Sequence, residues 1–346
     1  MKTKVAAIGL GHLGKHHARI YSQLPEAQLV CVVDTCQERA REIGEKLQVP
    51  HFTHIQELPN NIEAASIATP TSSHYEVAKP LLEKGIHLLI EKPITSNSSQ
   101  AQELVEIAQK NNCKLQVGHI ERFNPAWQKA KKYIQNPYYI EAQRTSPYRF
   151  RSTDISVVHD IMIHDLDILL HLIPAPLDSL EATGQSLLSP LPDIAHVRLR
   201  FENNCIASLK ASRLSLQPRR TMEIYQNNGY LHIDFMHKTL SQITLAPSFC
   251  PKNIQQIPPN PPQNLEERLF QDFLHHTQWK DTNHQEPLKT EIQAFLHSIQ
   301  QNLPVEVSGK DGLYALEIAE KILHQLQNPK NQPLPNNHIP TPPHQT

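Results

Sequence analysis

The sequence predicts two domains: an α/β domain with a parallel sheet, then an α+β domain with a mostly antiparallel open sheet. In the first third of the chain, short apolar runs alternate with segments of helical periodicity, which is typical of βαβ units. Later segments alternate in polarity and are separated by turn residues such as Asn227-Asn228-Gly229, which favours antiparallel hairpins. We therefore expect domains over residues 1–120 and 121–327, and a disordered, proline-rich tail over 328–346.

A glycine-rich turn follows the first apolar run. Gly9, Gly11 and Gly14 form the pattern Gly-x-Gly-x-x-Gly, which allows a tight turn, a close approach of pyrophosphate to the backbone, and close packing of the next helix. The second apolar run ends at Asp34, where a carboxylate can accept hydrogen bonds from the adenosine ribose. The first domain is therefore predicted to be a Rossmann domain. We expect NAD rather than NADP, because Asp34 would repel the 2′-phosphate of NADP.

Three later apolar runs end in residues that a ligand can contact. They are followed by Thr69-Pro70 with His74, by Glu91-Lys92-Pro93 and by Gly118-His119. Ligands of open parallel sheets bind outside the carboxyl ends of the strands. We therefore expect Lys92 beside the nicotinamide position. The alternative is a surface lysine before a rigid proline turn.

The second domain is expected to combine strands with a few helices. The expected strands are 140–146, 177–183, 195–201, 206–212, 220–226, 230–235 and 241–245. The expected helices are 125–134, 160–173, 289–301 and 312–327, the last capped by Ser308 or Asp311. Residues 246–264 are rich in proline and predict an irregular connection.

Asp160 and His164 lie four residues apart in an apolar stretch, which places both on one face of an α-helix. A carboxylate there can orient the imidazole, raise its pKa and support it as a general base. Oxidation of an alcohol needs such a base, because the hydroxyl proton must leave as the hydride is transferred. Asp165 and Asp167 follow in the same stretch, and either could be the working acid. A metal site built from these acids and histidines is the rival chemistry.

Composition argues against several other classes of protein. Lys plus Arg (33) nearly balances Asp plus Glu (34), so no nucleic-acid partner is expected. No apolar run reaches the roughly 18 residues that cross a membrane, and the first strand begins too early for a signal peptide, so we expect a cytoplasmic protein. The five cysteines lack Cys-x-x-Cys spacing, which favours free thiols and no metal site. We expect His16-His17 and His275-His276 on the solvated surface.

Taken together, these motifs resemble the Gfo/Idh/MocA family of glucose-fructose oxidoreductase and inositol dehydrogenase type. The matching motifs are Gly9-x-Gly11-x-x-Gly14, Ala68-Thr69-Pro70 with His74, Glu91-Lys92-Pro93, Arg122-Phe123-Asn124-Pro125, Asp160-x-x-x-His164 and Val305 to Leu313. The resemblance covers about residues 3 to 325. One departure is Ser156-Val157-Val158-His159, which replaces a glycine-rich lead-in and disfavours simple free-sugar substrates.

The resemblance implies roles for individual residues. It implies that Lys92 holds substrate and cofactor, that His164 accepts the proton, and that Asp160 is the partner of His164. The residues implied to contact NAD are Gly9, Gly11, His12, Leu13, Gly14, Asp34, Thr69, Pro70, His74, Glu91, Lys92 and Arg122. The resemblance also implies a homodimer or homotetramer that pairs through the sheet of the second domain.

Residues 118–126 and 160–167 most resemble the branch that oxidises UDP-N-acetylglucosamine at its 3-hydroxyl. In that branch an aminotransferase normally takes the 3-keto product toward 3-amino sugars, such as those of some lipid A molecules. Asn124, Lys92, Asp160 and His164 are then expected to contact the sugar. Three arginines precede the catalytic stretch and suit a diphosphate, although a solvated basic loop is the alternative. They are Arg144, Arg149 and Arg151, of which the last two are the expected substrate contacts.

Two other functions compete with this one. A dehydrogenase of inositol or a free sugar would share the fold but would need no arginine cluster. A non-catalytic dinucleotide sensor is a candidate from another class. The presence of Lys92, Asp160 and His164 argues against a sensor, because binding alone does not need them.

Overall fold

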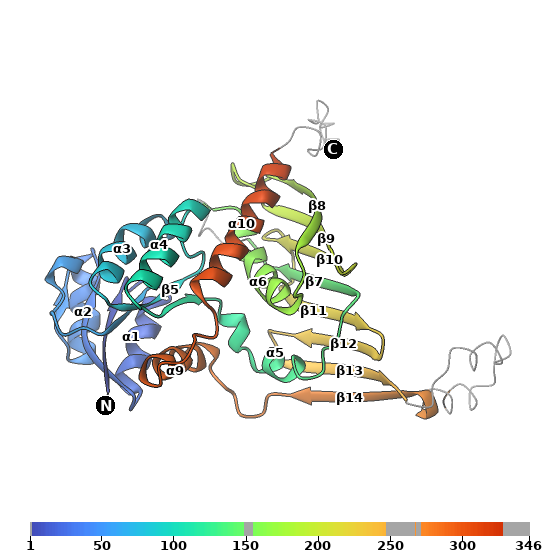
Figure 1. Ribbon diagram of the computed structural model, residues 1–346, viewed down its shortest axis with the longest axis horizontal. Coiled ribbons are helices and arrows are strands. Elements are labelled where there is room, and N and C mark those ends of the chain that lie inside the picture. The colour runs from blue at the N-terminus through green and yellow to red at the C-terminus, as the bar shows by residue number, and fades with distance from the viewer. Residues whose placement is uncertain (1, 149–154, 247–266, 268–270, 328–346) are drawn as a thin grey trace, which may run out of the picture.

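The computed structural model describes residues 2–148, 155–246, 267 and 271–327, and contains two sheets (Figure 1). The predicted tail over 328–346 lies outside the described residues, as does nearly all of the proline-rich connection. No helix in the described part of the chain is both long enough and apolar enough to cross a membrane.

The first sheet is parallel, with the strand order β3-β2-β1-β4-β5-β6. Its strands are β1 (Thr3–Ile8), β2 (Ala27–Val33), β3 (His51–Phe52), β4 (Ala64–Ile67), β5 (His87–Glu91) and β6 (Leu115–Gly118). Its helices are α1 (Gly14–Gln23), α2 (Gln37–Leu47), α3 (His74–Glu83) and α4 (Ser98–Lys110). This is the order of a Rossmann domain, and the chain reverses its direction of winding between β1 and β4. The predicted fold class of the first domain is confirmed.

The second sheet is mostly antiparallel, with the order β14-β13-β12-β11-β7-β10-β9-β8. Its strands are β7 (Tyr139–Thr145), β8 (Leu177–Gln185), β9 (Ile194–Phe201), β10 (Ile206–Ser212), β11 (Arg219–Gln226), β12 (Gly229–Asp234), β13 (Thr239–Leu245) and β14 (Leu274–Lys280). Seven of these were expected. β9–β10 and β11–β12 are antiparallel hairpins, the second at the predicted turn Asn227-Asn228-Gly229. β7 and β10 pair in parallel.

The edge strand β14 was not expected. Its side chains are mostly exposed on both faces, so its sequence lacks the alternation of a half-buried strand. His275 and His276 lie on this strand and are exposed, as expected.

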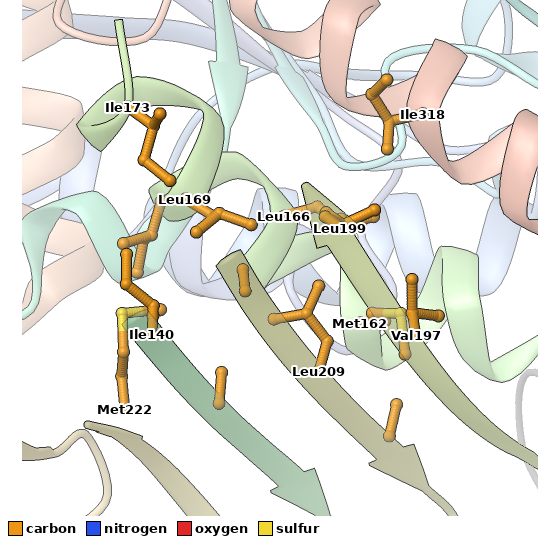
Figure 2. Packing of buried hydrophobic residues seen from close by; sticks show 14 of the residues in the cluster. Ile140, Met162, Leu166, Leu169, Ile173, Val197, Leu199, Leu209, Met222 and Ile318 are labelled. Atoms are coloured by element: carbon orange, nitrogen blue, oxygen red, sulfur yellow. The ribbon is translucent and has the colours of Figure 1, made fainter. Parts of the chain in front are cut away.

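Helices cover one face of the second sheet and form its core. They are α5 (Pro125–Ala130), a π-helix (Val158–Met162), α6 (Ile163–Leu172) and α10 (Gly309–Leu326). Figure 2 shows Met162, Leu166 and Leu169 packed against strand residues such as Leu209 and Met222. Because this apolar side of α6 is fixed on the sheet, the polar residues of the same segment are held at constant positions.

The last two helices connect the two sheets. α9 (Pro287–Gln300) places Phe295 and Leu296 in the same core cluster as Val5 and Leu29 of the first sheet. α10 contacts α4 as well as α6 and runs between the sheets in Figure 1. A capping box of Ser308 and Asp311 begins α10, as predicted. The carboxyl ends of the Rossmann strands therefore lie next to the second domain.

Candidate active site

The turn between β1 and α1 has the shape that a dinucleotide needs. Gly9 has a φ of +81°, and a Cβ atom there would lie 2.6 Å from the backbone nitrogen of Thr69. A Cβ atom on Gly14 would lie 1.6 Å from the carbonyl oxygen of Gly9. At Gly11, by contrast, nothing lies within 4 Å of where a Cβ atom would be. This open space beside the N-terminus of α1 fits a pyrophosphate group.

Asp34 lies just after β2 and is buried. Its carboxylate accepts hydrogen bonds from the backbone N–H groups of Leu10, at 2.7 Å, and Cys36, at 2.8 Å. These bonds hold the carboxylate beside the glycine turn, where the adenosine ribose of a Rossmann cofactor binds. The guanidinium of Arg39 lies 3.2 Å from the same carboxylate. A positive charge therefore lies at the point that selects between NAD and NADP.

His74 lies inside the protein and joins two loops of the site. Its Nε2 is 2.9 Å from the carbonyl oxygen of Thr69, and its Nδ1 is 2.9 Å from that of Pro93. Burial lowers the pKa of His74, and the hydrogen bonds to the two carbonyl oxygens oppose this without outweighing it. The structure therefore gives His74 a positioning role between the loops that follow β4 and β5, while Pro70 is exposed.

Lys92 follows β5 and reaches the second domain. Its Nζ donates a hydrogen bond to the carbonyl oxygen of Asp160 at 2.6 Å and lies 3.2 Å from Oδ1 of the same residue. The side chain of Lys92 is 14% exposed, so its charge is largely shielded from solvent. The structure thus brings together two of the three predicted catalytic residues, one from each domain.

The predicted pairing of Asp160 with His164 is wrong. Asp160 lies in a π-helix, Val158–Met162, and His164 lies in α6, which follows it. The carboxylate of Asp160 bonds to Lys92 instead. Among the described residues, the buried Nδ1 of His164 has no hydrogen-bond partner.

The predicted effect of Asp160 on the imidazole is wrong as well. Burial lowers the pKa of His164 well below its usual value, and the positive charges of Lys92 and Arg144 lower it further. The ring is therefore neutral at pH 7 and able to accept a proton. His164 is half-buried, which leaves part of the ring accessible to a ligand.

Two residues predicted to contact ligands are bound by protein groups. Arg122 is buried and donates to both carboxylate oxygens of Asp167, at 2.7 and 2.9 Å. Asn124 is buried too, and its amide donates to Glu121 at 2.9 Å and to the carbonyl oxygen of Phe235 at 3.0 Å. These bonds join separate segments of the chain, and among the described residues the buried Nη1 of Arg122 has no hydrogen-bond partner.

Arg144 is not available to bind a diphosphate. Arg144 is buried, and its guanidinium donates to both oxygens of Asp165 and to Glu121, the latter at 2.6 Å. Its donors are used inside the protein, so grouping it with the substrate arginines was wrong. Arg149 and Arg151 lie outside the described residues.

The prediction of a solvated His17 is wrong. This side chain is fully buried, and its Nε2 lies 3.0 Å from Oε1 of Glu91 at the end of β5. One signal in the sequence could have shown this. His17 shares a helical spacing with Gly14, Ala18 and Tyr21, all of which are buried on α1.

Comparison with known proteins identifies the family. Residues 3–119 match the model described as "Oxidoreductase family, NAD-binding Rossmann fold", and residues 130–232 match the GFO/IDH/MocA C-terminal domain. The chain belongs to the Gfo/Idh/MocA oxidoreductase family. It is therefore an NAD-binding dehydrogenase that acts on CH–OH groups.

Relatives in this family include a nucleotide-sugar enzyme and an inositol enzyme. The UDP-N-acetylglucosamine 3-dehydrogenase of Acidithiobacillus ferrooxidans is 38% identical over 238 residues, covering 68% of this chain and 75% of the relative. A solved structure of that enzyme superposes with a TM-score of 0.83 at 32% identity, covering 94% of this chain and 98% of the other. The scyllo-inositol 2-dehydrogenase (NAD(+)) of Bacillus subtilis is 30% identical over 234 residues, covering 62% and 68%.

Proposed function

We propose that this enzyme oxidises the 3-hydroxyl of UDP-N-acetylglucosamine to the 3-keto sugar. The observation that carries the proposal is the similarity to a UDP-N-acetylglucosamine 3-dehydrogenase across both domains, at 32% identity over 94% of this chain. The second domain contributes Asp160 and His164. Similarity to the relative in this domain therefore supports a similar substrate, and not only a similar cofactor. NAD, when bound, accepts the hydride from the carbon that carries the hydroxyl.

In this proposal His164 takes the hydroxyl proton. Its neutral ring is ready to accept a proton, and burial keeps it neutral over the pH range in which an ordinary histidine is partly charged. Lys92 positions the reacting oxygen and stabilises the negative charge that develops on it. Asp160 holds the lysine ammonium through its carbonyl and carboxylate oxygens, so its role is to position Lys92.

The substrate diphosphate needs positive groups that protein carboxylates do not already occupy. We keep Arg149 and Arg151 as the proposed contacts, because Arg144 is held in the interior. Replacing either with alanine should mainly raise KM for a UDP-sugar, by about 30-fold if a charge-assisted bond worth about 2 kcal/mol is lost. Unchanged KM for both variants would assign these arginines to a solvated loop.

A substrate panel tests the proposed function. UDP-N-acetylglucosamine, UDP-glucose, N-acetylglucosamine, scyllo-inositol and myo-inositol should be compared by kcat/KM for NADH formation. We expect UDP-N-acetylglucosamine to be the best substrate and the free sugar to lose most of the activity. A higher kcat/KM for an inositol would instead favour the second candidate function, which the 30% identical inositol relative supports.

We further propose that the 3-keto product is consumed by an aminotransferase, which would give a 3-amino sugar for lipid A or another surface glycan. A coupled assay tests this step. A purified sugar aminotransferase with glutamate should pull the oxidation forward, and the product should contain one amine in place of the 3-hydroxyl.

We also propose that subunits pair through the open face of the second sheet. α5, α6 and α10 cover one face of this sheet, while the other carries the adjacent rings of Tyr139, Tyr225 and Tyr230. Light scattering coupled to size-exclusion chromatography should show a dimer or tetramer. Tyr225→Glu should shift the protein toward the monomer, whereas an unchanged mass would place the interface elsewhere.

A further inference from the structure

A buried pair lies directly before the catalytic lysine. Glu91, at the end of β5, has a side chain that is 10% exposed, and its Oε1 lies 3.0 Å from Nε2 of the fully buried His17. Gly118 on β6 faces the same carboxylate, because a Cβ atom there would lie 3.0 Å from Cδ and Oε2 of Glu91. The carboxylate is thus held between α1 and β6.

The partners of His17 indicate which member of the pair is charged. Among the described residues, the buried Nδ1 of His17 has no hydrogen-bond partner. A protonated ring would leave a charged N–H donor unsatisfied there, which costs more than leaving the acceptor of a neutral ring unsatisfied. His17 therefore donates from Nε2 as a neutral ring, and the negative charge stays on Glu91. Burial raises the pKa of Glu91, but the interactions around the carboxylate, of which the hydrogen bond from His17 is the strongest, outweigh this and lower it.

The other groups around Glu91 do not cancel its charge. The titratable groups that face it are His17 on α1, Lys92 in the following turn, His74 on α3, His119 after β6 and Glu291 on α9. Burial lowers the pKa of His74 and of His119, which disfavours a positive charge on either ring. Burial raises the pKa of Glu291 well above its usual value, which favours the uncharged carboxyl. The charge of Lys92 is matched by Asp160.

Glu91 therefore adds a negative charge at the carboxyl end of β5, the edge at which a Rossmann domain binds its cofactor. The nicotinamide ring is positively charged in NAD+ and neutral in NADH, so a fixed negative charge distinguishes the two forms. We propose that Glu91, held by His17, sets the balance between oxidised and reduced cofactor by favouring the charged ring of NAD+. This inference rests on the binding of NAD and is independent of the sugar substrate.

Binding measurements on Glu91→Gln test the proposal. The change removes the charge but keeps the shape, so the ratio Kd(NAD+)/Kd(NADH) should rise on the order of tenfold by calorimetric titration. A tenfold change raises the potential of the bound two-electron couple by about 30 mV. Glu103→Gln is the matched control, because it removes a half-exposed carboxylate on α4 of the same domain, where it pairs with Lys79. The ratio Kd(NAD+)/Kd(NADH) of this control variant should stay within about twofold of the wild-type ratio.

A second variant separates this role from a structural one. His17→Leu removes the donor to Glu91, so the pKa of Glu91 should rise and the ratio should increase as the pH is lowered from about 8 to about 6. This series decides the question alone if Glu91→Gln fails to fold. Folded variants whose ratio matches the wild type at every pH would overturn the proposal. That result would leave the assignment as an NAD-binding oxidoreductase unchanged.

Discussion

Replacing Arg144 with methionine tests how the helix that carries His164 is held. Arg144 donates to Asp165 at 2.7–3.1 Å and to Glu121 at 2.6 Å, inside the protein. Methionine fills much of the same space but leaves the buried carboxylate of Asp165 without its hydrogen-bonded cation, and Glu121 with only Arg220 at 3.8 Å among the described residues, which should lower the free energy of unfolding by about 3–5 kcal/mol. Because folded domains are typically stable by about 5–15 kcal/mol, urea denaturation followed by circular dichroism should resolve the loss.

The same variant has a second readout and a matched control. Arg144 is one of the positive charges that lower the pKa of His164, so the acidic limb of the pH–rate profile should move to higher pH in Arg144→Met. Arg219→Met removes an exposed arginine on β11 and should change stability by less than about 0.5 kcal/mol. A loss below about 1 kcal/mol for Arg144→Met would refute the reasoning that these carboxylates depend on Arg144.

Three further predictions concern the site itself. His164→Ala should lower kcat about 100- to 10,000-fold while leaving NAD affinity nearly intact, and a normal kcat with hydride transfer rate-limiting would exclude it as the base. The wild-type rate should rise with pH through a midpoint below about 6.5, because the neutral ring is the base and its pKa is lowered; a higher midpoint would contradict this. Arg39→Ala should raise the preference for NAD over NADP by about two- to fivefold in paired Kd measurements, because Arg39 offsets the charge of Asp34. An unchanged preference would show that Arg39 does not affect the choice between NAD and NADP.

Most of the fold could be predicted because most strands have a buried face that imposes a pattern on the sequence. The run before Gly9 and the acid at Asp34 also lie close together along the chain, so the Rossmann turn was visible as a local motif. β3 and β14 were missed for opposite reasons. β3 has only two residues, and β14 is exposed on both faces, so neither can show a period.

The site was harder to predict because its contacts join distant segments. Lys92 could be placed at a strand end, but its bond to Asp160 crosses 68 positions in the chain. The helical spacing of Asp160 and His164 misled, because the carboxylate of Asp160 bonds to Lys92 of the first domain, and spacing within one helix does not show that contact. In the same way, the guanidinium of Arg144 is a group that could bind a diphosphate. Only its burial against Asp165 shows that the protein already occupies it.

Transfer of deuterium tests the proposed function most directly. The enzyme should be given UDP-N-acetylglucosamine that carries deuterium at C3, and the reduced cofactor should be analysed by mass spectrometry. If His164 removes the proton of the 3-hydroxyl, the hydride must come from C3, so the reduced cofactor should be one mass unit heavier. Substrate deuterated at C4 should give unlabelled NADH. Unlabelled NADH from the C3-deuterated sugar, or no turnover of this sugar by an enzyme that oxidises an inositol, would contradict the assignment.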